Sequence, residues 1–343
     1  MKLAAGTRSV IAVGTLLSSL APAARSQQAP LLQLPDGGTV EVLGLRRWTL
    51  AMLQDSLARY SPGDSLQSHA CAAVLRYKLH FADAASTGVS MGVGTPEHVV
   101  VTVREPQDSA RVHYRMMPLD SVRPRRAWTV VTQPMSRQPD LVRMTVGTLY
   151  LDPATHGAPR FRTSADSIEA VKILSFLRAR TSEKDRLEAL DVLSRDPNMY
   201  DRSVATLILA NFGARDDTWW ALVDAMRESD GQAKDYAASV LEALSTRSAR
   251  AVDWMPRSKG IHAMLDGTSL FEVPALIRVL LKTDVGPRHA RAFLKGGGEI
   301  LLVYLESRES MFFSGPSHAL LVRLRGKDLG SSAEPWRAWI ATL

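Results

Sequence analysis

The first part of the chain changes from the strand period of apolar residues to the helical period. Residues 39–43 follow two glycines and place apolar residues at alternate positions, which predicts a short strand. A helix is expected over residues 50–60, where large side chains recur at helical spacing: Leu50, Leu53, Leu57 and Tyr60. A Ser-Pro-Gly turn ends it, and Asp64 or Ser65 can cap a second helix that runs to about Leu79. The two helices should form a hairpin against a sheet.

The strand period dominates the stretch that follows. Residues 88–95 are rich in glycine and small residues, which favours a loop or an irregular strand. Strands are then expected at residues 97–104, 111–116, 127–132 and 141–151. Pro134 and Pro139 separate the last two, because proline breaks a ladder. Residues 31–151 are therefore expected to form a small α+β domain in which a helix hairpin packs on an antiparallel sheet.

The strand pattern stops at residues 152–163, a segment that contains two prolines and a glycine and is the best linker candidate. A cut there should separate two halves that fold independently. Helices with caps at Ser164 and Ser182 should follow, and further helices are expected over residues 201–212, from Asp216 onward and around residues 237–244. Residues 255–270 should form a loop or shortened helices, since they contain Pro256, Gly260 and Gly267.

The helical half repeats itself. Residues 204–208 align with residues 237–241 at an offset of 33. Two further pairs recur at an offset of 44: residues 275–280 with 319–324, and residues 284–286 with 328–330. Helical pairs that recur at such intervals indicate an α-solenoid, in which each pair buries its apolar face by stacking on its neighbours.

These repeats resemble a known family. Residues 164–343 look like HEAT-repeat proteins. The last unit is similar to the terminal units of bacterial HEAT-repeat proteins: Ala319-Leu320-Leu321, then Arg-Gly-Lys-Asp-Leu-Gly at residues 325–330, then Trp336-Arg337-Ala338-Trp339. The resemblance implies a curved scaffold that holds other proteins, and it carries no catalytic residues. The expected fold class is therefore α+β, with the small N-terminal domain followed by an all-α HEAT-like solenoid.

The amino terminus has the pattern of a cleavable secretory signal. Lys2 and Arg8 precede an apolar run over residues 10–20, and small residues follow, so residues 1–26 are expected to be removed. A short uncleaved membrane anchor is the alternative. The expected location is secreted or periplasmic. No later segment has 18 uninterrupted apolar residues, so we expect no stable membrane insertion after the signal is removed.

The net charge by itself decides nothing about a partner, and its distribution gives no support for a nucleic-acid partner. The formal net charge is +7, and residues 1–26 contribute three of these charges, which leaves +4 for the processed chain. The remaining excess lies before residue 164, because residues 164–343 contain 24 basic and 24 acidic residues. A nucleic-acid-binding protein usually gathers its basic residues into a stripe. The tightest cluster here is Arg123, Arg125 and Arg126, which a solvated loop explains.

Cys71 is the only cysteine, so an internal disulfide is excluded. It lies among small residues of an expected helix, where cysteine behaves as a compact buried apolar group. His69, His80 and His98 leave a thiol nucleophile or a metal site as weaker interpretations. No two-histidine helix motif, phosphate loop or nucleophile elbow occurs, so we assign no catalytic, cofactor-binding or metal-binding residues.

Two functions from different classes remain, and an envelope structural protein with no soluble ligand is a third possibility. The first is an exported interaction or scaffold module that binds a partner protein or peptide through its helical-repeat surface. The second is an envelope hydrolase with a thiol site around Cys71, together with His69 and His98, in the N-terminal domain. Replacement of Cys71 would abolish the second function and spare the first.

Overall fold

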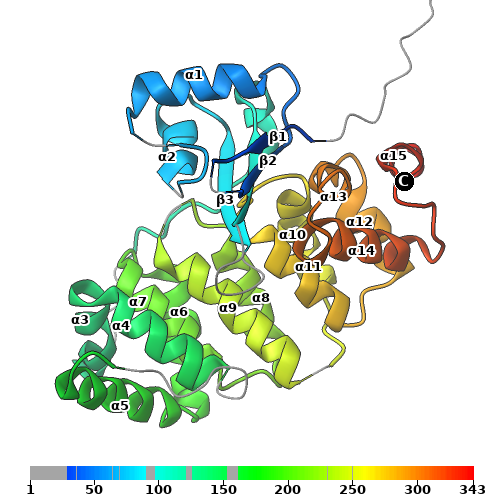
Figure 1. Cartoon of the computed structure of the whole chain (residues 1–343). Helices are drawn as coiled ribbons and strands as arrows, with labels where there is room; N and C mark the ends of the chain where they lie inside the picture. The colour runs from blue at the N-terminus through cyan, green and yellow to red at the C-terminus, as the bar shows by residue number, and fades with distance from the viewer. Residues whose placement is uncertain are drawn as a thin grey trace, which may run out of the picture.

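The computed structural model describes residues 29–343 except residues 36, 64, 69, 90–96, 121–125, 153–160, 230 and 249. The expected signal at residues 1–26 and most of the expected linker at residues 152–163 lie outside the described residues. The described chain is mostly helical and contains a four-stranded sheet, which confirms the α+β class. Figure 1 shows the sheet with α1 and α2 above the stacked helices of the rest of the chain.

The sheet is mixed and not antiparallel as expected. Its strands have the order β1-β2-β4-β3: β1 (Leu31–Gln33), β2 (Thr39–Leu43), β4 (His98–Arg104) and β3 (Asp83–Val89). β1 with β2 and β3 with β4 are antiparallel, whereas β2 and β4 are parallel. Parallel neighbours need a long connection, and residues 44–97, which include the helix hairpin and β3, connect β2 to β4. The strands predicted at residues 39–43 and 97–104 are confirmed, but β3 was not predicted because alanine, serine and glycine dominate it.

The helix hairpin covers one face of the sheet. It consists of α1 (Leu50–Tyr60) and α2 (Ala70–Tyr77), which confirms the prediction of a helix over residues 50–60. Thr49 caps α1 by accepting a hydrogen bond from the Met52 backbone N–H at 3.2 Å. The buried side chains between hairpin and sheet are apolar: Leu53, Leu57, Cys71 and Leu75 from the helices, and Val40, Val42, Val99, Val101 and Val103 from the strands.

Three expected strands are wrong. The segment expected as a strand at residues 111–116 begins with the last residue of a 3-10 helix, Arg111, and contains one isolated bridge, between Arg115 and Glu228. The other two segments are helical: α3 (Thr129–Arg137), α4 (Pro139–Met144) and the π-helix η3 (Thr145–Leu151). Val142, Val146 and Tyr150 recur every four residues and are buried in the same core as α5 and α7. Burial of this helical face therefore outweighs the strand preference of the valines and threonines.

The remaining helices continue to the C-terminus, where the chain ends beside α15 (Figure 1). They are α5 (Ser164–Arg178), α6 (Glu183–Arg195), α7 (Met199–Leu209), α8 (Asp216–Met226), α9 (Gln232–Arg247), α10 (Ser258–Leu265), α11 (Val273–Lys282), α12 (Ala290–Leu294), α13 (Glu299–Leu305), α14 (Gly315–Arg325) and α15 (Ala333–Ile340). The predicted cap of α6 at Ser182 is confirmed, but the cap of α5 is Thr163, one residue before the predicted Ser164. Each cap forms a capping box with the aspartate three residues later.

The helices stack in two layers. α7, α9, α11 and α14 contact one another in that order, while α8, α10 and α12 form the corresponding contacts in the second layer. Two of the turns between the layers share one detail. The indole N–H of Trp219 donates to the Gly213 carbonyl at 2.8 Å, and that of Trp336 donates to the Gly330 carbonyl at 2.7 Å. The same spacing of six residues therefore builds the same turn twice.

Candidate functional site

The second face of the sheet carries polar side chains beside buried Leu43, Ala85 and Val100, and it is fixed to the loops between stacked helices. The register places Glu41, His98 and Arg104 on this face together with Asp83. The buried Glu41 carboxylate accepts hydrogen bonds from the Ser307 hydroxyl at 2.8 Å and the Arg308 backbone N–H at 2.9 Å. Such charge-assisted bonds offset the cost of burying a carboxylate. They hold β2 against the loop that follows α13.

The loop before α11 is fixed to the sheet in the same way. The buried Arg104 guanidinium donates to the Asp266 carbonyl, and Arg111 binds the Asp266 carboxylate through two hydrogen bonds, at 3.0 and 2.8 Å. Gly267 crosses directly over Arg104 with φ of +112°, and a Cβ there would overlap the guanidinium. Asp83 accepts a hydrogen bond from the Leu270 N–H at 3.0 Å. The sheet and the stacked helices thus share a buried, hydrogen-bonded junction.

A single carboxylate organises the loop between β2 and α1. The backbone N–H groups of Arg46, Arg47 and Trp48 donate to Glu105 Oε1 at 2.7, 2.9 and 2.9 Å. Burial alone would raise the pKa of Glu105, but these N–H groups and Gln107 lower that pKa below its ordinary value. Glu105 therefore stays ionised and fixes the loop. The side chains of Arg46 and Arg47 are consequently exposed, whereas Trp48 packs against Phe81 with ring centroids 5.0 Å apart.

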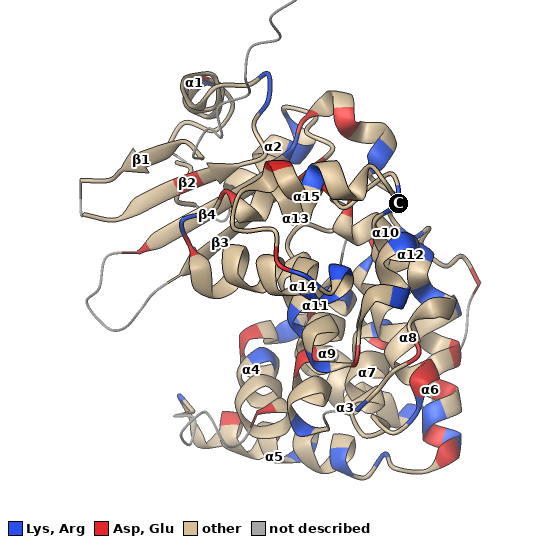
Figure 2. Ribbon diagram, turned by 90° about the vertical axis from the view of Figure 1, so that its right-hand side faces the viewer, with Lys and Arg blue, Asp and Glu red and all other residues tan. Residues whose placement is uncertain are grey.

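A cleft of about 1230 Å³ opens between this loop and the C-terminal helices. Its basic residues come from both walls: Arg46 and Arg47 from the loop, Arg308 and Arg337 from the helical side. Its acidic residues come from the helical side alone: Glu299, Glu306 and Glu334. Apolar surface lies between them, mainly from Leu45, Trp48, Val303 and Ala333. Around α13 and α15, Figure 2 shows residues of both charges close together.

One ion pair crosses the cleft, and the others lie within one wall, including the pair of Arg46 with Asp108 at 3.8 Å. Arg46 Nη2 lies 2.6 Å from Glu299 Oε1, and Arg337 Nη2 lies 3.9 Å from the same oxygen. Arg337 also pairs with Glu334 at 2.9 Å. Arg47 is exposed and forms no ion pair with any residue that the structure describes. Burial raises the pKa of Glu306. The charges of Arg337 and Arg46 oppose this rise, and the charge of Glu299 adds to it.

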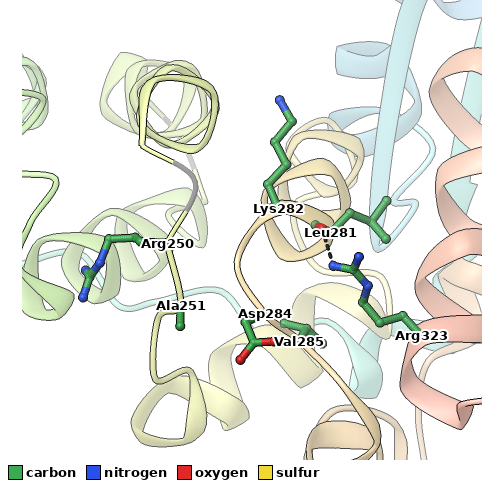
Figure 3. Close-up of a pocket in the computed structure, with 7 residues that line it drawn as sticks. All are labelled: Arg250, Ala251, Leu281, Lys282, Asp284, Val285 and Arg323. Atoms are coloured by element: carbon green, nitrogen blue, oxygen red, sulfur yellow. Dashed lines mark hydrogen bonds between the residues drawn. The ribbon is translucent and has the colours of Figure 1, made fainter.

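A second pocket, of about 610 Å³, lies among the C-terminal ends of α9, α11 and α14. Figure 3 shows that its cations, Arg250, Lys282 and Arg323, point in different directions. Each is already used: Arg250 pairs with Asp216 at 2.6 Å, Lys282 donates to the Thr246 hydroxyl at 3.0 Å, and Arg323 donates to the Leu281 carbonyl. These contacts join successive helix pairs, so this pocket is part of the stacking.

The structure does not bring the expected thiol-site residues together. Cys71 is 0% exposed on α2, where Sγ contacts the Leu66 carbonyl oxygen at 3.6 Å. His98 lies on the other face of the sheet, with Nδ1 2.5 Å from the Thr39 hydroxyl and Nε2 3.6 Å from Glu41. His69 lies outside the described residues. The sheet therefore separates the thiol from His98.

Sequence reasoning missed the cleft because its walls come from distant parts of the chain, residues 29–50 and residues 299–337. The local signal that was present is the pair Arg46-Arg47 next to Trp48, directly after a predicted strand. Among the described residues, no group of three or more histidine, cysteine or acidic side chains could hold a metal ion. In the same part of the chain, no helix has the length and apolar character that crossing a membrane requires. In comparisons with protein-family models, curated proteins and solved structures, nothing matches this chain.

Proposed function

We propose that the protein is an exported interaction module that binds a partner protein or peptide, with the cleft between the β2–α1 loop and the C-terminal helices as its binding site. The cleft volume of about 1230 Å³ is the observation that carries the proposal. Pockets for small molecules typically measure about 300–1,000 Å³, so this cleft has room for a polypeptide segment.

The construction of the cleft supports the same function. Its walls come from two parts of the chain that are joined by buried hydrogen bonds of Glu41 with Ser307 and of Arg104 with Asp266. A site held by such contacts changes little on binding, which lowers the entropic cost of association. Arginine and tryptophan, which both line the cleft, are the residue types that contribute most to protein interfaces.

The stacked helices supply the second part of the proposal. α7, α9, α11 and α14 lie side by side, and the turn with a buried tryptophan occurs twice. This arrangement is in keeping with a HEAT-like helical repeat, in which each pair buries its apolar face against the next. A scaffold of that kind presents a continuous surface on which a partner can extend beyond the cleft.

Site-specific photo-crosslinking tests this proposal. A photoreactive phenylalanine analogue would replace Ser331, which is exposed and lines the cleft. The matched control would carry the same analogue at Ser175, which is exposed on α5. In extracts of the host cells we expect a covalent adduct from Ser331 that excess unlabelled protein suppresses, and no such adduct from Ser175. Adducts of equal yield at both positions, or none at Ser331, would overturn the assignment of the cleft.

A further inference from the structure

The outer edge of β1 has main-chain groups available for another strand. Leu34 N–H donates to the Gly38 carbonyl at 2.9 Å, and Val42 N–H donates to the Pro30 carbonyl at 3.0 Å. In an antiparallel ladder, hydrogen-bonded residue pairs alternate with non-hydrogen-bonded pairs. The main-chain N–H and C=O groups of residues 30, 32 and 34 therefore point toward β2. The N–H and C=O groups of Leu31 and Gln33 therefore point away from β2. Within the part of the chain that the structure describes, no hydrogen bond uses them.

This edge leads directly into the cleft. Ala29 and Pro30 line the cleft, and β1 begins at the next residue, Leu31. A strand rises about 3.3 Å per residue. A polypeptide that pairs with Leu31 and Gln33 therefore enters the cleft within one or two residues.

The charged residues of the cleft indicate which side chains a bound strand should have. Four arginines and three glutamates line the cleft. Arg46 pairs with Glu299 and Asp108, and Arg337 pairs with Glu334 and more distantly with Glu299. Arg47 adds a guanidinium that no described residue pairs. Arginine guanidinium groups bind carboxylates through paired hydrogen bonds, which favours acidic side chains in the partner.

We propose that the cleft binds an extended acidic segment of a partner polypeptide, which adds a strand to the outer edge of β1 and places its carboxylates against the arginines of the cleft. This inference rests on the proposed function. β1 has only three residues, and short edges of this kind limit strand addition. Main-chain pairing here gives few hydrogen bonds, so the arginine contacts must supply much of the affinity. The mode of recognition is strand addition with side-chain selection.

The test begins with a displayed library of random peptides of about 12 residues, a length that spans β1 and the cleft at about 3.3 Å per residue. Selection on the full chain is expected to yield peptides rich in aspartate and glutamate. A selected peptide would then be methylated at one backbone nitrogen at a time. Methylation at alternate positions is expected to weaken binding about tenfold, while the positions between tolerate it, because only every second N–H pairs with β1.

Two variants test the protein side. Gln33→Pro removes an N–H that points away from β2, so it should weaken peptide binding about tenfold, whereas Gln33→Ala should bind like the wild type. Arg47→Glu should weaken binding by more than tenfold, and Arg195→Glu, an exposed change on α6, should have no effect. Circular dichroism confirms that each variant folds.

Several results would overturn the inference: no acidic peptide selected, methylation effects without alternation, or Gln33→Pro and Arg47→Glu proteins that bind like the wild type. Any of these, combined with a specific adduct at Ser331, would leave the cleft as a binding site for a partner recognised in another way. Loss of the Ser331 adduct itself is the separate result that removes the proposed function.

Discussion

At the scale of single residues, the junction between sheet and helices depends on buried carboxylates. Glu272 is 1% exposed and Asp83 is 2% exposed. Lys234 Nζ lies 3.3 Å from Glu272 Oε1, and Arg76 Nε lies 3.6 Å from Asp83 Oδ1. Taking carboxylates out of water costs free energy that a single cation offsets only in part. The junction is therefore expected to respond to pH.

The pKa of Glu272 determines whether the junction is stabilised or destabilised as pH rises. Burial raises the pKa of Glu272 from 4.5 to about 8, although Lys234 opposes the rise. Because the folded pKa lies above the unfolded one, the folded state binds the proton more tightly, and stability falls as pH rises from about 4.5 to about 8. Glu272→Gln should flatten this fall, so urea unfolding at the two ends of this range should differ less than in the wild type. Glu169→Gln, on the surface of α5, should keep the wild-type pH dependence; an equal fall in the Glu272→Gln protein would contradict the prediction.

Gly44 is the residue on which the β2–α1 loop turns. It has φ of +87°, and a Cβ at this position would overlap the Val103 carbonyl oxygen. Gly63 offers a matched control because it has φ of +99° but open space around it. Gly63→Ala should cost about 1–2 kcal/mol through the backbone alone. Gly44→Ala should cost clearly more and lower the thermal midpoint further. Equal destabilisation of the two variants would show that the close approach to Val103 is unimportant.

At the scale of elements, the sequence predicted helices well and strands unevenly. The hairpin helix at residues 50–60 and the cap at Ser182 follow from local periodicity and local hydrogen bonds, which are visible in the sequence. Residues 129–151 contain β-branched residues, yet they form helices because Val142, Val146 and Tyr150 share one buried face. That four-residue spacing was present in the sequence. The strand prediction relied instead on the β-branched composition of these residues, which is the weaker signal.

The turn that precedes α15 gives a prediction at this scale. Trp336 is fully buried, and its indole N–H satisfies the Gly330 carbonyl at 2.7 Å. Trp336→Phe removes the donor and leaves a cavity, so it should destabilise the chain by about 2–4 kcal/mol in urea unfolding. Trp339→Phe, in the same helix but partly exposed, should cost less than about 1 kcal/mol. A larger loss from Trp339→Phe would contradict the role of the Trp336 hydrogen bond.

At the scale of the whole molecule, the sequence could not show which distant segments meet. Arg46 and Glu299 are 253 residues apart, and their ion pair forms only because β2 docks on the loop after α13. Glu41 lies in the middle of a predicted strand, between valines that pack against the helix hairpin, so its side chain must lie on the opposite face of the sheet. The partner that such a buried carboxylate requires could not be identified from one sequence. The periodicity of apolar residues therefore could not reveal the cleft.

The same contacts bear on where the chain can be divided. A cut at residues 152–163 was expected to release an independent helical half. However, the Tyr150 hydroxyl donates to the Leu207 carbonyl at 3.0 Å, and Arg247 donates to the carbonyls of Tyr150 and Leu151. Trp128, just before α3, and Val131, in α3, are also buried in the core that contains α7 and α9. The helices before the cut therefore complete the core that lies after it.

This packing predicts different behaviour for two fragments. A fragment of residues 164–343 lacks at least five buried side chains of that core: Trp128, Val131, Met135, Val146 and Tyr150. At about 1.5–3 kcal/mol for each large side chain, their removal forfeits an amount comparable with the whole stability of a typical domain, about 5–15 kcal/mol. A fragment of residues 126–343 retains them. It loses the sheet, its hairpin and residues 105–125, including the contacts of Arg111 with Asp266 and of Arg115 with Glu228. Thermal unfolding followed by circular dichroism should show a cooperative transition for residues 126–343, and a broad or absent transition for residues 164–343. Equal midpoints and equal cooperativity in the two fragments would mean that the helices of residues 129–151 are an appendage, and that the linker is a true boundary between independent cores.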